Sequence, residues 1–154
     1  MSEDDVKGRG RGPTPAVAMG KRITKPIKVL VTPNGGSNGK QIDCDLAPGD
    51  NASRPYVTKD KVTLTKDEGP FRIEFELDGL YWDEDNPFNT SRAAGCPPGN
   101  KKTNDNEQIF LQPANGRSLV VLNLNDGDAC RIQFRMNFAD GTYCDPILEN
   151  GGRT

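Results

Sequence analysis

The chain contains no histidine. Imidazole serves as the base in Ser-His-Asp and Cys-His catalysis, binds zinc and copper, and titrates near neutral pH. These chemistries are therefore excluded. Apolar residues are also scarce, at 33% of the 154 residues. No stretch reaches the ~20 apolar residues that a membrane-spanning helix needs. The sequence predicts a soluble protein that does not cross a membrane.

The beginning of the chain lacks the apolar core of a secretory signal, so we expect a cytoplasmic protein. Residues 1–28 carry seven basic and three acidic side chains, whereas the remainder has a net charge of −6. We predict a disordered, basic, Gly/Pro-rich leader over 1–25, a domain over 26–150 and a short tail over 151–154. The Arg-Gly steps of residues 8–12 lack interleaved aromatics, so nucleic-acid binding is expected through the leader at most.

Alternation of apolar and polar residues is the main structural signal. Phe71, Ile73, Phe75 and Leu77 alternate with charged residues, and a period of two puts all four on one side of a strand. We expect Phe75 and Phe134 to lie on inner faces of the core. Shorter or similar patterns predict further strands at 27–31, 42–46, 61–65, 109–111, 119–124, 130–138 and 143–148.

About seven or eight short strands without crossover helices predict an all-β fold, a single antiparallel β-sandwich. A small closed β-barrel is the rival, because both architectures use the same alternation. A three-residue loop at 125–127 would join 119–124 and 130–138 as a hairpin. That register places Leu122 opposite Cys130 and Val120 opposite Ile132, with both apolar sets on one face.

The candidate ligand site is the long 78–106 segment, which has no sustained apolar pattern. Loops of this length are usually functional or disordered. Its polar and aromatic residues suggest two interpretations. In one, Trp82 stacks on a sugar ring while nearby polar groups bind the hydroxyls. In the other, which we favour, Tyr81, Trp82 and Phe88 fill one end of the sandwich, because large aromatics are mostly buried. The candidate ligand-binding residues are Tyr81, Trp82, Asp83, Asp85 and Asn86.

Oxygen-rich clusters raise the question of a hard cation such as Ca²⁺. Their spacing does not match the EF-hand loop, and Asp and Asn commonly serve turns. We therefore expect no metal and no cofactor. Asp83 and Asp85 as a glycosidase pair rank lowest, because nothing suggests an apolar pocket that raises the pKa of one carboxyl group. The clusters comprise Asp83, Asp85 and Asn86, and separately Asn123, Asn125, Asp126 and Asp128.

The four cysteines contain no C-x₂-C pair, which argues against a zinc ribbon. Cys44 and Cys130 share the phase of apolar neighbours and are expected in the core. If the protein meets an oxidising compartment, we expect Cys96 to pair with Cys144. Without a visible signal peptide, free thiols are expected instead.

Two segments carry a resemblance to known folds. Residues 61–65 followed by 69–75 resemble the paired strands of cupredoxin-like and immunoglobulin-like sandwiches. The end, 143–152, is similar to the tails of small uncharacterised bacterial β-sandwich proteins. The resemblance spans about 60–152 and implies a sandwich fold. It does not imply blue-copper electron transfer, because that site needs two histidines with a cysteine.

These observations predict a non-enzymatic interaction or structural module with another protein as its partner. The working surface is expected at the 78–106 segment or at a sheet edge. The alternative is a carbohydrate-binding domain that uses Trp82, Asp83 and Asp85, and a hydrolase is the lowest-ranked reading.

Overall fold

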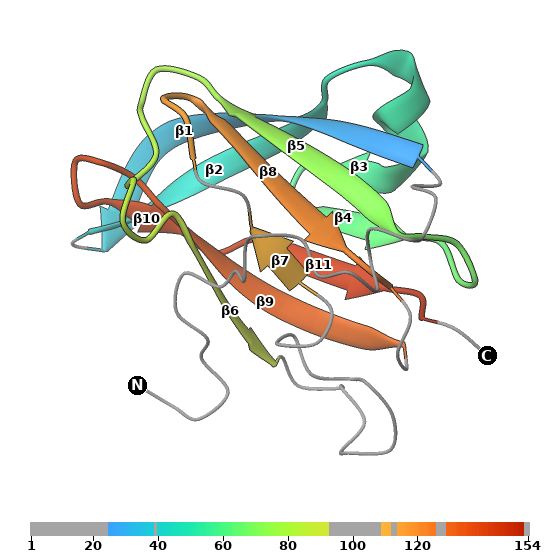
Figure 1. The fold of residues 1–154 in the computed structure, drawn as a ribbon. Coiled ribbons are helices and arrows are strands. Elements are labelled where there is room, and N and C mark those ends of the chain that lie inside the picture. Colours follow the sequence, from blue (N-terminus) through green and yellow to red (C-terminus); the bar gives the residue numbers. More distant parts are fainter. Residues whose placement is uncertain (1–24, 39, 93–108, 112–113, 126–128, 153–154) are drawn as a thin grey trace.

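The computed structural model describes residues 25–38, 40–92, 109–111, 114–125 and 129–152. This part of the chain is all-β, as predicted, and its only helix is a short 3-10 helix (Figure 1). No helix within it is long and apolar enough to cross a membrane. The predicted leader and Cys96 lie outside the described residues. The elements are β1 Lys25–Asn38, β2 Gln41–Pro48, η1 Asn51–Tyr56, β3 Val57–Thr58, β4 Lys61–Leu64, β5 Phe71–Leu77, β6 Phe88–Arg92, β7 Ile109–Leu111, β8 Ser118–Asn123, β9 Cys130–Asn137, β10 Tyr143–Cys144 and β11 Ile147–Asn150.

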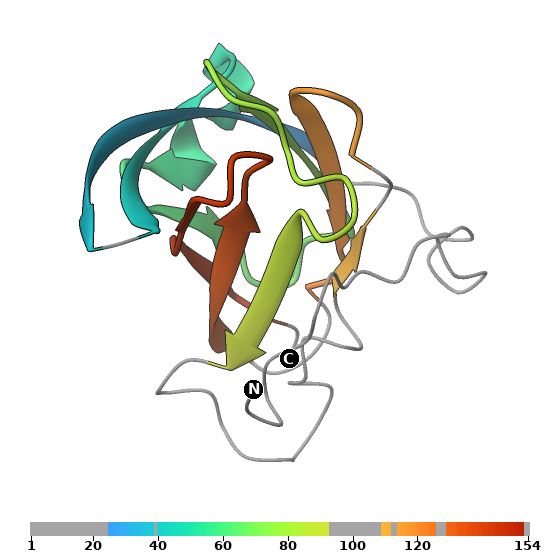
Figure 2. The same cartoon turned by 90° about the vertical axis from the view of Figure 1, so that its left-hand side faces the viewer.

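The strands form one hydrogen-bonded path, β3-β4-β11-β9-β10-β2-β1-β5-β8-β7, with β6 added beside β9. Figure 2 shows this path curling around the core like half a barrel. Three pairs of neighbouring strands are parallel: β1 with β5, β4 with β11, and β2 with β10. The prediction of a simple antiparallel sandwich is therefore wrong. Alternation along a strand determines which face is buried. It does not determine which strand pairs with it, or whether the two run parallel or antiparallel.

Strand β5 lies between β1 and β8 and confirms the clearest predicted alternation. Its four apolar residues are 0–2% exposed, while Arg72 and Glu74 face outward and pair at 3.1 Å. The parallel register sets Val29 beside Phe75. Each buried side chain of this size stabilises the fold by ~1.5–3 kcal/mol through removal of apolar surface from water.

The opposite wall of the core comes from β9 and β6. Phe134 on β9 lies 5.8 Å from Phe75 and 5.0 Å from Phe88, measured between ring centroids. Phe75 and Phe134 are 2% and 1% exposed, which confirms their predicted places. Strand β6 lies inside the span that was expected to be a long loop. Its backbone pairs with β9 although Phe88 is the only large apolar residue in it, so periodicity could not reveal it.

The predicted hairpin between 119–124 and 130–138 is not formed. Strand β8 pairs with β5 and β7 instead, and Leu119 and Val121 are its inward residues. Leu122 faces the other way and forms a separate small cluster with Leu124. The postulated register was thus one residue out of phase. Residues 126–128, which include the glycine of the expected turn, lie outside the described residues.

Three buried asparagines join β8 to β11, and we call them the amide joint. Asn123 and Asn150 exchange side-chain hydrogen bonds, donating to each other at 2.8 and 3.1 Å. Asn125 has a φ of 50° and donates through Nδ2 to the carbonyl oxygens of Thr65 (2.8 Å) and Glu68 (2.9 Å). Its Oδ1 accepts from the amide of Gly152 at 2.8 Å. The buried amides are satisfied, as the interior of a protein requires.

Gly151 stands where β11 leaves the sheet and passes close to the end of β4. A Cβ at this position would lie 2.5 Å from the amide nitrogen of Lys66 and 2.7 Å from the carbonyl oxygen of Leu64. Both atoms belong to the backbone, so they cannot move aside cheaply. Only glycine permits this close approach.

A disulfide joins Cys44 of β2 to Cys144 of β10, with Cα atoms 6.1 Å apart. The expected Cys96–Cys144 pairing is therefore wrong, and so is the expectation of a free Cys44. Cys44 has the inward phase that sequence analysis recognised, but that phase points it at β10. The two cysteines are 100 positions apart in the sequence, so their spacing does not show that the fold brings their Cα atoms within reach of a disulfide.

Candidate functional site

The segment from Asp78 to Phe88 connects β5 to β6 and is tied to the sheet on both sides. Trp82 donates its backbone amide to the carbonyl oxygen of Gly116 at 3.0 Å. On the other side, the amide of Ala139 donates to the carbonyl oxygen of Tyr81 at 2.8 Å, and the amide of Asp83 donates to Asn137 at 3.0 Å. These bonds fix the backbone of the candidate site to the turn before β8 and to the end of β9.

Tyr81 and Trp82 are adjacent but point in opposite directions, as residues in extended backbone do. Trp82 is 1% exposed and packs on Phe138, with 5.7 Å between ring centroids. Phe88 is equally buried. Both fill the end of the core, as the favoured interpretation expected. Tyr81, in contrast, is 55% exposed and does not belong to this core. Trp82 therefore offers no ring face to a sugar.

Arg117 supports Tyr81 from the turn that precedes β8. Its guanidinium carbon lies 4.9 Å from the centre of the Tyr81 ring, within the range of a cation–π interaction. The turn is closed by two hydrogen bonds between the backbones of Asn115 and Ser118, of 2.9 and 3.0 Å. Gly116 has a φ of 62°, which glycine adopts at no steric cost. Sequence analysis missed Arg117, although the Asn-Gly pair before it was a usable turn signal.

A hollow of about 460 Å³ adjoins Tyr81. We call the surface formed by Tyr81, Arg117 and this hollow the Tyr81 platform. The hollow is large enough for a peptide side chain or a sugar ring, since ligand pockets begin at ~300 Å³. Its lining residues are Tyr81, Trp82, Asp83, Glu84, Gly116 and Ala139.

The carboxylate of Asp83, beside the platform, has a structural task. Oδ1 of Asp83 accepts from the backbone amides of Asp85 at 3.0 Å and Asn86 at 3.3 Å, which closes an Asx turn. Asp85 itself is exposed and Asn86 is half-buried. Within the described residues, no group of three His, Cys, Asp or Glu side chains could hold a metal ion.

The second oxygen-rich cluster is part of the amide joint. Oδ1 of Asn123 accepts from Asn150 and from the amide of Asn125, and Oδ1 of Asn125 accepts from Gly152. Both amide oxygens are therefore committed to the fold. Asp126 and Asp128 lie outside the described residues.

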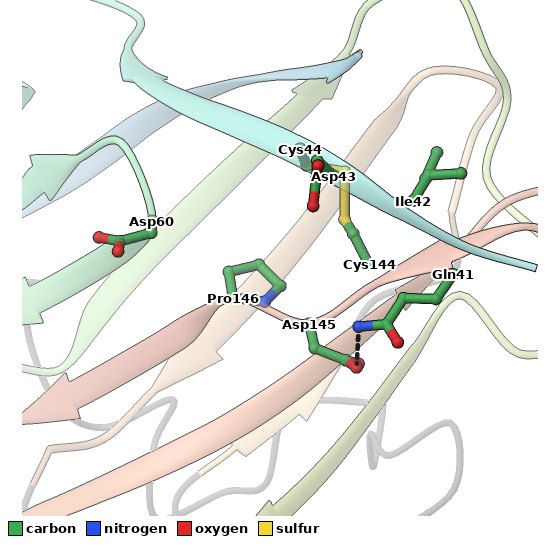
Figure 3. A pocket seen from close by; sticks show the side chains of 8 residues that line it. All are labelled: Gln41, Ile42, Asp43, Cys44, Asp60, Cys144, Asp145 and Pro146. Atoms are coloured by element: carbon green, nitrogen blue, oxygen red, sulfur yellow. Dashed lines mark hydrogen bonds between the residues drawn. A yellow bond between two sulfur atoms is a disulfide. The ribbon is translucent and has the colours of Figure 1, made fainter. Parts of the chain in front are cut away.

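A smaller pocket of about 180 Å³ lies beside the disulfide (Figure 3). Asp145 accepts a hydrogen bond from Nε2 of Gln41 at 3.2 Å, and its other oxygen lies 3.5 Å from Nε of Arg135. Arg135 also stacks over the ring of Tyr143, at 3.9 Å. The lining residues are Gln41, Ile42, Asp43, Cys44, Asp60, Cys144, Asp145 and Pro146.

Comparison with protein-family models, curated proteins and solved structures gives no match for this chain. The resemblance to small bacterial, cupredoxin-like or immunoglobulin-like sandwiches stays a prediction. Function must therefore be argued from the geometry of the chain itself.

Proposed function

We propose that this chain is a non-enzymatic interaction module that binds another protein through the Tyr81 platform. The observation that carries the proposal is Tyr81, a large aromatic side chain that is 55% exposed on a backbone fixed from both sides. Tyrosine suits a protein interface because its ring is apolar while its hydroxyl group can still bind water or a partner. Tyrosine and arginine are also the side chains most often found at the energetic centre of protein interfaces.

Preorganisation supports the same proposal. The hydrogen bonds to Gly116 and Ala139 hold the backbone of Tyr81 and Trp82 before any partner arrives. Arg117 restricts the Tyr81 ring through its position over the ring face. A partner therefore meets a surface whose ordering entropy has already been lost on folding, which raises affinity.

Carbohydrate binding is the second candidate function, with Tyr81 in place of Trp82 as the residue that stacks on the sugar. A tyrosine ring can stack on a sugar, and the carboxylates of Asp83 and Glu84 line the adjoining hollow. The candidate site thus keeps Tyr81 and Asp83 from the predicted set but gives Trp82 a supporting role only.

The location in the cytoplasm also stays a prediction. The Cys44–Cys144 disulfide weighs against it, because disulfides persist mainly in oxidising compartments.

Paired variants test the proposal. Tyr81→Ala should abolish capture of the partner from an extract of the source cells, with thermal stability nearly unchanged. Leu30→Ala is the matched control, because Leu30 is the other exposed large apolar residue of the described chain, at 45% exposure. Retained capture by Tyr81→Ala, or equal loss in Leu30→Ala, would reject the platform. Binding to a glycan array that disappears in Tyr81→Ala would select the carbohydrate alternative.

Trp82→Ala should behave differently from its neighbour. The side chain is buried, so its removal should cost ~3–5 kcal/mol in the free energy of unfolding through lost burial and a cavity. Chemical denaturation measures this cost. A Trp82→Ala protein as stable as the wild type would contradict the supporting role of this residue.

A further inference from the structure

Strands β2 and β10 meet at one residue pair only, Tyr143 with Gln41. The amide of Tyr143 donates to the carbonyl oxygen of Lys40 at 3.0 Å. Beyond this point the 180 Å³ pocket lies against both strands, and the disulfide crosses from Cys44 to Cys144 beside it (Figure 3). On its other edge, β2 pairs with β1 along most of its length. The disulfide therefore stands where backbone pairing between β2 and β10 is missing.

Both cysteines line the pocket, and Cys44 is half-buried whereas Cys144 is 2% exposed. Cys44 is thus the more exposed of the two residues. We propose that the Cys44–Cys144 disulfide is a redox-sensitive clasp, opened through this pocket by small thiols that carry a positive charge. Opening it releases β2 from β10 and leaves the rest of the sheet in place.

The reaction is thiol–disulfide exchange. A thiolate of the reductant attacks Sγ of Cys44, the bond between the two cysteine sulfurs breaks, and Cys144 leaves as a thiolate that takes up a proton. A second reductant thiolate then attacks the reductant sulfur of the mixed disulfide and releases Cys44. Two reductant thiols are oxidised to one disulfide, while Cys44 and Cys144 are reduced.

The charge around the pocket determines which thiols react fast. Asp43, Asp60 and Asp145 line it, and its lining residues include no Lys or Arg. Of the cations around this site, Arg135 lies 3.5 Å from Asp145 and Lys59 lies 3.8 Å from Asp45. Lys40, next to Gln41, does not line the pocket. An anionic thiol is therefore repelled, whereas a cationic group offsets the charge of the attacking thiolate.

The effect of opening should be local. The Tyr81 platform is fastened to Gly116, Asn137 and Ala139, and none of these bonds involves β2. Strand β10 also keeps its antiparallel pairing with β9. The end of β1 that faces the first half of β2 has two register irregularities, between Pro33 and Ser37. The order of this end of the β1–β2 hairpin should therefore depend most on the disulfide.

Reduction kinetics test the charge selectivity. The full chain with Cys96→Ser and Cys130→Ser confines exchange to the Cys44–Cys144 pair, which peptide mapping verifies first. The rates of cysteamine and 3-mercaptopropionate are compared at equal thiolate concentration, and each rate is divided by the rate of the same thiol with a small model disulfide. Cysteamine should then react ~3–10-fold faster than 3-mercaptopropionate. Because the difference is electrostatic, 1 M salt should remove it. Asp43→Asn with Asp60→Asn should shrink the ratio. Asp78→Asn with Glu84→Gln, two carboxylates away from the pocket, should leave it unchanged. The proposal would be overturned if peptide mapping found no Cys44–Cys144 disulfide, or if cysteamine and 3-mercaptopropionate reacted at equal relative rates. It would also be overturned if the two double variants changed the ratio equally.

Amide hydrogen exchange tests the clasp. Reduction, or Cys44→Ala with Cys144→Ala, should accelerate exchange at the amide of Tyr143 by a larger factor than at amides in β5 and at the amide of Trp82. The latter amides open with the whole fold and lose only the protection that corresponds to the drop in global stability. Unchanged protection at Tyr143 would show that the disulfide holds nothing. An equal factor of acceleration at Tyr143 and at the amides of β5 and Trp82 would show a support for the whole fold instead of a clasp, and would also reject the proposal.

Discussion

The amide joint and the disulfide fasten distant parts of the same curled sheet by different means. The amide joint connects β8 to β11 and the turn after β4 through buried asparagines whose amide groups are hydrogen-bonded. The disulfide connects β2 to β10 beside a polar pocket, where backbone pairing is limited to one residue pair.

The difference follows from access of water. A hydrogen bond inside the protein competes with no solvent, and its loss leaves costly unpaired groups. At the edge of a polar pocket, water replaces a broken hydrogen bond at little cost, so a covalent link is the more effective fastening. Polar side chains can therefore hold a sheet together where they are buried completely.

The largest effect is expected at the amide joint. Asn125→Ala removes one donor and one acceptor group, and leaves the carbonyl oxygens of Thr65 and Glu68 and the amide of Gly152 without this partner. The amide of Gly152 is buried, whereas the two carbonyl contacts are part-buried. With ~1–3 kcal/mol for each group that loses this partner, unfolding should become easier by ~4 kcal/mol. Urea denaturation measures the change. Asn115→Ala, at an exposed turn, is the control, and a similar small effect in both would contradict the buried joint.

Loss of the disulfide should cost somewhat less. Cys44→Ala with Cys144→Ala removes a link across 100 positions and should lower the free energy of unfolding by ~3 kcal/mol. The same denaturation experiment applies, with Cys96→Ala as the control. If the double variant is as stable as the wild type, the covalent link adds nothing to backbone pairing.

A smaller effect separates pairing from burial inside the amide joint. Asn123→Leu and Asn150→Leu each leave the partner amide unpaired, whereas the double variant removes both. Asn150→Leu should therefore lower the free energy of unfolding by ~1–2 kcal/mol less when Asn123→Leu is already present than it does in the wild type. Simple additivity of the two costs in a double-mutant cycle would show that the reciprocal pair is not coupled.

The smallest effect is a dependence on pH near the disulfide. The Thr142 hydroxyl at 2.5 Å and the Thr142 amide at 2.9 Å lower the pKa of Asp140, in the turn before β10. This stabilisation is present above the unfolded carboxyl pKa of ~3.9 and is lost as pH falls through the folded value. Thr142→Val should thus destabilise the protein at neutral pH, and the difference from wild type should vanish in acid. The deficit of Asn125→Ala should not vary with pH, because its partners do not titrate.

The sequence predicted the buried faces of β5 and β9, but neither the buried face of β8 nor the partners of the strands. The phase of Phe75 and Phe134 follows from alternation, since charged neighbours cannot face the core. The partner of β8 does not follow, because Leu119 and Val121 can pack against any inward-facing strand. Parallel pairing of β1 with β5 has no local sequence signature at all.

The candidate site was predicted in part for a similar reason. The exposed Tyr81 and the buried Trp82 have the same residue class and the same neighbours in sequence. Their opposite fates depend on hydrogen bonds to Gly116 and Ala139, which come from distant positions. Arg117 and the Cys44–Cys144 pair likewise depend on contacts made only after the chain has folded.

The parallel pairing of β4 with β11 also determines when the protein can fold. Val62 pairs with Leu148, so this part of the sheet cannot close before nearly the whole described chain has left the ribosome. Until β9 has also emerged, the buried face of β5 lacks the Phe134 wall and stays open to other chains. Sheets with such distant pairings typically fold in milliseconds to seconds. The nascent chain therefore passes through a period in which it depends on dilution or on chaperones to avoid aggregation.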